Sequence, residues 1–181
     1  MRADLALLMI FIGAPDVPGA KADPWAQRES GLERAEATIS QCLERAGSTP
    51  PTDAQHCVNA VYIACESEHG TMSQHDLNDC AYFSYRAWDA RRIAARTRLF
   101  GAKTIDPRFG RAEPRVQKLE ESERRWDEWN EADCEMQVPS SEVGSMKAME
   151  RELCLSSHAA HRALELEALE FWWAKMFKLP E

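Results

Sequence analysis

The chain has 181 residues, a length that favours one domain with a hydrophobic core of ordinary size. It carries 30 acidic and 22 basic side chains, which gives a formal net charge of −8. This balance argues against nucleic acid and anionic membranes as partners, because lysine and arginine are needed to bind phosphates. It is compatible with a cationic partner, or simply with a charge that keeps the protein soluble.

The first 22 residues have the pattern of a secretory signal peptide. Arg2 precedes the apolar run LALLMIFIGA, and Ala20-Lys21-Ala22 supplies the small side chains that signal peptidase requires. The run is about ten residues long, roughly half of a membrane span, so we expect cleavage after Ala22 rather than an uncleaved anchor. We therefore expect one mature domain over residues 23–181, without a transmembrane segment, in the periplasm or outside the cell.

The N-terminal part of the mature chain predicts two helices after a loose leader at residues 23–28. Apolar side chains recur at helical spacing from Glu29 until Gly47, where Pro50-Pro51 also stops the pattern. A second helix is expected to begin near Asp53. We interpret residues 29–64 as an N-terminal helical extension of the domain.

A long third helix is expected to begin after Ser73. Ser73 and Asp76 resemble a capping box, with aspartate in place of the usual glutamate or glutamine. Gly101 is expected to end this helix. The next segment, residues 101–114, contains two glycines and two prolines and therefore predicts a surface connector.

Two further helices complete the predicted fold. The fourth runs from about Arg115 to Cys134, and the fifth begins near Glu142 or Ser145 and continues towards Met176. The apolar residues of the fourth helix that we expect to face inward are Val116, Leu119, Trp126 and Trp129. No segment alternates with period two, so the sequence predicts an all-α protein, a disulfide-braced bundle of about five helices.

Three disulfides are expected, because six cysteines follow the signal peptide of an exported chain. Cys57 and Cys65 lie on one predicted helix at a separation of about 12 Å, and a disulfide tolerates only about 7 Å between Cα atoms. These two therefore cannot pair with each other. The favoured pairs are Cys42–Cys57, Cys65–Cys80 and Cys134–Cys154. The crossed pairing, Cys42–Cys65 with Cys57–Cys80, stays open.

Two sequence elements resemble the LprI-type lysozyme inhibitor family. After Cys65, the stretch TMSQHDLNDCA is similar to the family's Met-Asn-x-Cys-Ala element and contains Asn78, Cys80 and Ala81 at the matching positions. The stretch SERRWDEWNEADC is similar to a second family element, which ends in a cysteine. Its matching residues are Arg124, Trp126, Trp129, Glu131 and Cys134.

The resemblance covers residues 65–166. Gly144-Ser145 resembles the family's glycine-glycine-serine turn, with one glycine missing, and Cys154 and Arg162 match the closing cysteine and the arginine of the final helix. The family's Leu-Asn-x-x-Tyr element after Trp88-Asp89 is replaced by residues 92–96. We expect a structural role for the motif residues Asn78, Trp88, Trp126, Trp129 and Arg162.

The resemblance implies an exported, non-enzymatic binding protein that inhibits lysozyme or a similar cationic wall-degrading enzyme, without a cofactor. The chain itself contains no serine elbow, phosphate loop or zinc-protease motif. A disulfide-tethered loop loses little entropy on binding, so we expect the partner to contact the loop between the last two cysteines. The expected contact residues are Glu131, Asp133, Glu135, Glu142, Gly144 and Ser145.

Two other interpretations remain open. Aromatic residues point around the whole circumference of the tail, residues 167–181, which either folds back over the first helix or docks the protein as an envelope structural or assembly module. His158, His161 and Glu165 have a spacing that could bind a metal, but no further ligand cluster accompanies them, so we expect no metal site.

Overall fold

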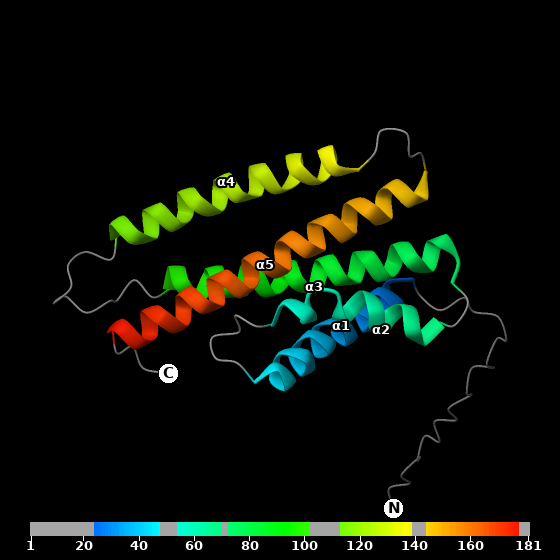
Figure 1. Ribbon diagram of the computed structural model, residues 1–181, viewed down its shortest axis with the longest axis horizontal. Coiled ribbons are helices and arrows are strands. Elements are labelled where there is room, and N and C mark those ends of the chain that lie inside the picture. Colours follow the sequence, from blue (N-terminus) through cyan, green and yellow to red (C-terminus); the bar gives the residue numbers. More distant parts are fainter. Residues whose placement is uncertain (1–23, 48–53, 70–71, 102–112, 139–143, 178–181) are drawn as a thin grey trace, which may run out of the picture.

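The computed structural model describes residues 24–47, 54–69, 72–101, 113–138 and 144–177. In this part of the chain every regular element is a helix, as Figure 1 shows. The elements are α1 (Pro24–Ala46), the short 3-10 helix η1 (Ala54–Cys57), α2 (Ala60–His69), α3 (Gln74–Gly101), α4 (Glu113–Gln137) and α5 (Ser145–Phe177). The predicted fold class, an all-α disulfide-braced bundle, is confirmed.

Residues 1–22, the predicted signal peptide, lie outside the described part of the chain. None of the described helices combines the length and the apolar character that crossing a membrane would require.

The prediction of a loose leader at residues 23–28 is wrong, because α1 already begins at Pro24. Proline is favoured in the first helical turn, where its missing N–H would have no intrahelical acceptor. At the other end, Gly47 adopts a φ of 63° and donates its N–H to the carbonyl oxygen of Leu43 at 3.3 Å. This left-handed cap ends α1, and glycine adopts it without steric cost.

The predicted capping box at the start of α3 is present. The backbone N–H of Ser73 donates to Oδ2 of Asp76 at 2.8 Å, and the N–H of Asp76 donates to Oγ of Ser73 at 3.3 Å. Both bonds satisfy N–H groups that have no partner within the helix, so the shorter aspartate replaces the usual glutamate.

The two long helices α3 and α5 form the centre of the bundle, with α1 and α2 on one side and α4 on the other (Figure 1). Small buried residues allow the central pair to approach closely, and Ser84 Oγ lies 2.8 Å from Ser156 Oγ between them. Trp88 is completely buried, and its indole N–H donates to the carbonyl oxygen of Val58 at 3.1 Å. That bond ties α3 to the turn before α2.

A second apolar cluster packs between the C-terminal parts of α3 and α5 and helix α4. It contains Leu99 of α3, Leu119 of α4, and Leu166 and Trp173 of α5. The aromatic tail is therefore split, because Trp173 is buried against α3 and α4 whereas Trp172 beside it is 48% exposed.

The disulfides join consecutive cysteines. Cys42–Cys57 links α1 to η1, Cys65–Cys80 links α2 to α3, and Cys134–Cys154 links α4 to α5, with Cα–Cα distances of 5.8, 5.6 and 5.6 Å. The crossed pairing is not formed.

Candidate functional site

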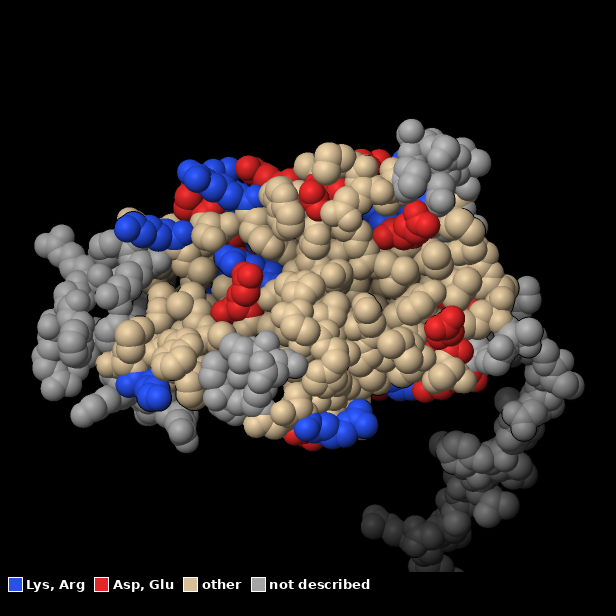
Figure 2. All heavy atoms as spheres, in the orientation of Figure 1, with Lys and Arg blue, Asp and Glu red and all other residues tan. Residues whose placement is uncertain are grey.

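The net negative charge of the chain is concentrated in one crosslinked hairpin, formed by the end of α4 and the start of α5. Residues 127–154, here called the acidic hairpin, carry eight acidic and two basic side chains, a net charge of −6. The whole chain has −8, so the remaining residues are close to neutral. In Figure 2 charged side chains line α4 at the upper edge of the view, whereas the middle of that face is mostly uncharged.

Both basic residues of the acidic hairpin pair with carboxylates of α4. Arg151 contacts Glu131 and lies 3.5 Å from Glu135, and Lys147 Nζ lies 3.3 Å from Glu135 Oε1. All four side chains are partly or largely exposed, so each pair contributes little stability. The pairs instead set the orientation of Glu131 and Glu135, two of the predicted contact residues, along the seam between α4 and α5.

A second cluster of side chains forms around His158, between α4 and α5. The ring of His158 stacks on the indole of Trp129 with centroids 4.6 Å apart and planes inclined by 21°. Its Nδ1 lies 2.9 Å from Oδ1 of the buried Asn130, and its Nε2 lies 3.6 Å from Oδ2 of Asp133. Asp133, another predicted contact residue, therefore belongs to this cluster rather than to the seam of ion pairs.

The electrostatics of this cluster favour a neutral imidazole. Burial lowers the pKa of His158 below its ordinary value, the nearby Asp133 carboxylate partly opposes this, and His161 adds to the lowering. The neutral imidazole therefore covers one face of the Trp129 indole as an uncharged aromatic neighbour.

Trp129 does not face the core, so that prediction is wrong. Its side chain remains 49% exposed. The inward face of α4 is set by Cys134, which must point at α5 to form the disulfide, and by the buried Asn130. At about 100° per residue, Trp129 lies about 140° around the helix from Cys134. Met136, seven residues after Trp129, shares its outward face and is also exposed.

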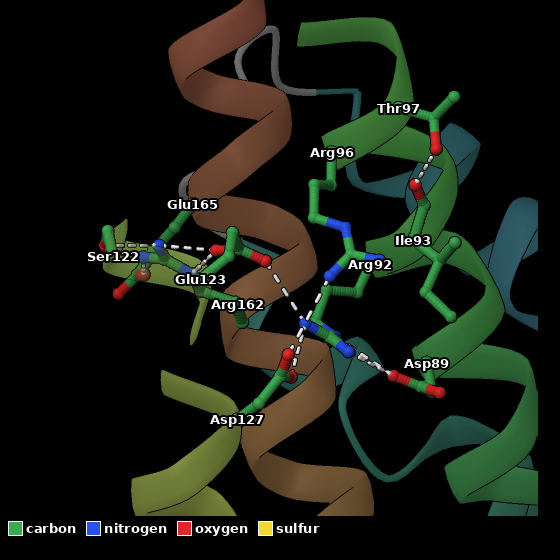
Figure 3. A network of polar contacts seen from close by, with 10 residues as sticks. All are labelled: Asp89, Arg92, Ile93, Arg96, Thr97, Ser122, Glu123, Asp127, Arg162 and Glu165. Atoms are coloured by element: carbon green, nitrogen blue, oxygen red, sulfur yellow. Dashed lines mark hydrogen bonds and ion pairs between the residues drawn. The ribbon is translucent and has the colours of Figure 1, made fainter. Parts of the chain in front are cut away.

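A buried charge network holds α4 on the central pair, as Figure 3 shows. Glu123 of α4 is only 2% exposed and lies between two arginines. Arg92 of α3 donates to its Oε2 at 3.1 Å, and Arg162 of α5 donates to its Oε1 at 2.7 Å. The family-motif residue Arg162 thus binds a buried carboxylate of α4.

Further contacts extend the network along α3. Arg92 also binds Asp89 at 2.9 Å and Asp127 at 3.0 Å, and its guanidinium lies 4.4 Å from the ring centroid of Trp126. Arg96 approaches the same Asp127 at 3.8 Å. Arg92 and Arg96 stand in the segment where the chain departs from the family pattern, so this departure contributes directly to how α4 is held.

Sequence reasoning missed Arg92 and Glu123, although a signal was present. Arg92 lies four residues after Trp88 and three before Ala95, on the apolar seam of its helix. Glu123 follows Leu119 by four residues in the same way. Two opposite charges on inward positions of two helices indicate a buried ion pair, because an unpaired buried charge is prohibitively costly.

The structure gives the histidines other partners than a metal. His161 Nε2 lies 2.6 Å from Oε1 of Gln55, and Glu165 pairs with Arg162 at 2.8 Å. Among the described residues, two clusters place a histidine beside cysteine sulfurs, but each of these sulfur pairs is a disulfide and lacks the thiolate that binds a metal.

The remaining predicted residues lie at the edges of these features. Gly144 precedes α5 with a φ of 87°, which explains why the turn retains a glycine there. Glu142 and the side chain of Ser145 lie outside the described part of the chain. Asn78 accepts a hydrogen bond from Gln74 at 3.1 Å within the first turns of α3.

Comparison with known protein families agrees with these features. The family described as lysozyme inhibitor LprI matches residues 65–166. This segment contains α3, α4, the buried charge network and the crosslink Cys134–Cys154. Searches of curated proteins and of solved structures returned no significant match. Because the match extends over more than half of the chain, the protein belongs to the LprI lysozyme inhibitor family.

Proposed function

We propose that this protein is an exported, non-enzymatic inhibitor that binds lysozyme, or a similar cationic wall-degrading enzyme, through its acidic hairpin. The observation that carries the proposal is the concentration of the charge, −6 of a total −8, in one hairpin of a lysozyme inhibitor family member. A basic enzyme would be attracted to this end of the molecule by long-range electrostatics, which raises the association rate.

The construction of the hairpin supports a binding role. The crosslink Cys134–Cys154, the ion pairs of Arg151 and the stack of Trp129 on His158 hold the ends of the two helices together before any partner arrives. A surface that is already ordered loses less conformational entropy on association, so more of the contact free energy appears as affinity.

A lysozyme turbidity assay with the oxidised mature chain, residues 23–181, tests the proposal. We expect the protein to slow lysis of bacterial cells at micromolar concentration, and less so as the salt concentration rises. The double variant Glu131→Gln/Glu135→Gln should inhibit more weakly. The matched control, Glu33→Gln/Glu36→Gln on the exposed surface of α1, removes the same charge elsewhere and should inhibit like the wild type.

Unchanged lysis in a micromolar excess of the wild-type protein would contradict the proposal. Equal loss of inhibition in the hairpin and control variants would show that net charge matters but that its location does not.

A second candidate function is an envelope structural or assembly module that docks through the tail. The observation in its favour is the exposure of Trp172 and Met176 at the end of α5. The double variant Trp172→Ser/Met176→Ser leaves the buried Trp173 in place, so it tests docking without removing the core. Docking predicts that affinity capture from envelope extract loses a specific partner with this variant and retains it with the Glu131→Gln/Glu135→Gln variant.

A further inference from the structure

We propose that Trp129 is a receptor for a single lysine or arginine side chain of the basic partner. The inference rests on the proposed function, because it names the anchor point within the acidic hairpin. The arriving cation would lie over the exposed part of the indole and would form a cation–π contact there.

The first argument is the way in which Trp129 is exposed. Trp129 is 49% exposed, and unlike a freely moving surface side chain its ring is held in place. His158 stacks against it at 4.6 Å, and Asn130 holds His158 at 2.9 Å. An indole that is held on one face by a neighbouring ring resembles binding hot spots, in which tryptophan is enriched.

The second argument comes from the other tryptophans. The ring of Trp126 is covered by Arg92 at 4.4 Å, and the ring of Trp172 lies 5.3 Å from Nζ of Lys175. Each of these indoles therefore already has a cation from the chain itself. In the described part of the molecule no lysine or arginine lies over Trp129, whose ring neighbour is the neutral His158.

The third argument is the charge around the ring. Trp129 stands on the last turns of α4, where Glu128 precedes it and Glu131 and Asp133 follow it in sequence. Glu128 pairs with Arg124 and Glu131 pairs with Arg151, but the acidic hairpin as a whole keeps a net charge of −6. Neighbouring carboxylates attract a cation and strengthen its contact with an aromatic face, whereas an acidic or purely apolar partner would find this surface unfavourable. The occupant that fits is thus a basic side chain on a positively charged protein.

The test titrates the oxidised chain with an oligoarginine peptide and measures the affinity by isothermal titration calorimetry. Trp129→Leu keeps an apolar side chain but removes the π system, and Trp172→Leu is the matched control at an equally exposed tryptophan. We expect Trp129→Leu to bind the peptide about tenfold more weakly, while Trp129→Tyr and Trp172→Leu stay close to the wild type. Circular dichroism should show the same helix content in all four proteins.

Equal affinities of Trp129→Leu and Trp172→Leu, or a wild type that does not bind the peptide, would overturn the inference. A second titration with lysozyme separates this inference from the proposed function. If the wild type binds the peptide through Trp129 but does not bind lysozyme, the cation receptor stands and lysozyme is the wrong partner. If lysozyme binds wild type and Trp129→Leu equally well, the inhibitor stands and the receptor is wrong.

Discussion

Glu123 shows how one buried side chain can position a whole helix. Its carboxylate receives Arg92 from α3 and Arg162 from α5, so three helices meet at one charge. Such a site stabilises the native arrangement only while all partners are present, because a lone buried charge costs several kcal/mol. The network therefore makes the placement of α4 depend strongly on a few residues.

Replacing Glu123 by glutamine should destabilise the protein strongly. The amide keeps the shape of the side chain but leaves Arg92 and Arg162 without their shared counter-charge, which we expect to lower the free energy of unfolding by about 3 kcal/mol. Urea denaturation measures this. The control is Glu121→Gln on the same helix, where a carboxylate that is partly exposed to solvent has its pKa lowered to about 2 by Arg124 and Arg125. Equal midpoints for the two variants would contradict the prediction.

His158 gives the protein a pH-dependent stability. Burial holds its pKa below the ordinary 6.5, with Asp133 opposing and His161 adding to the shift. The folded state therefore binds fewer protons than the unfolded state between the two pKa values. Its contribution is fully present above about pH 6.5 and is lost as the pH falls through the lowered folded-state pKa.

We expect the thermal midpoint of the wild type to fall on going from neutral pH to about pH 5, and that of His158→Gln to fall less. Glu152 has the opposite sign, because burial raises the pKa of its carboxyl and protonation then favours the folded state. Glu152 is present in both proteins, so its effect cancels when the thermal midpoint of the variant is subtracted from that of the wild type at each pH. Parallel pH profiles would show that His158 does not titrate as proposed.

At the scale of elements, the contact between α1 and α3 depends on the absence of a side chain at Gly31. A Cβ at this position would lie 2.5 Å from the Phe83 ring, well inside van der Waals contact. Gly31 is buried within α1, where glycine otherwise weakens a helix relative to alanine. Its presence is explained by the close approach of the Phe83 ring.

Gly31→Ala should therefore lower the free energy of unfolding by about 1–3 kcal/mol, the cost of overpacking a core contact. The matched control is Gly101→Ala at the last residue of α3, where an added Cβ meets no atom within 4 Å. That variant should be neutral or more stable by up to about 1 kcal/mol. Denaturant midpoints measure both. A stabilised Gly31→Ala variant would show that Phe83 moves aside without cost.

The helices themselves were predictable from the sequence, because apolar spacing and capping residues act locally. Ser73 with Asp76, and Gly47 after α1, determine helix ends through contacts within a few residues. The inward face of α4 was predictable only in part: Val116 and Leu119 are buried as predicted, whereas Trp129 is exposed. Towards the end of the helix tryptophans and charges are mixed, and apolar spacing no longer identifies the buried side. Long-range partners decide it, namely Cys154 for Cys134 and two arginines for Glu123.

The candidate site was likewise predictable in its local features but not in those that depend on long-range contacts. The acidic character of the hairpin is visible in the sequence, since it is a count of charges over a short segment. The exposed position of Trp129 is not visible, because helical spacing alone made it equivalent to Trp126. Only the tertiary contacts of the two rings, with His158 and with Arg92, distinguish their roles.

At the scale of the whole molecule, α4 is the most loosely integrated helix. It lies along one side of the central pair (Figure 1), and charged contacts supply much of its attachment. The covalent link at Cys134–Cys154 is therefore expected to matter more for α4 than for the rest of the bundle.

The double variant Cys134→Ser/Cys154→Ser should be about 3 kcal/mol less stable, the entropy of the closed loop in the chain-entropy model. Native-state hydrogen exchange should show that the amides of α4 lose protection before those of α3. The buried interior of α3 provides the internal control. Uniform loss of protection in both helices would show that α4 unfolds only together with the whole domain.

The connectivity of the crosslinks also affects how the chain can mature. Each sulfur bond joins a cysteine to the next one along the chain, and no loop encloses another. During synthesis from the N-terminus, both cysteines of each pair are available before the next cysteine along the chain has been made. Each thiol can therefore form its native disulfide before a cysteine that belongs to a later pair can compete for it. A simple thiol oxidase would then be enough for maturation, and no isomerase would be required to reshuffle wrong bonds.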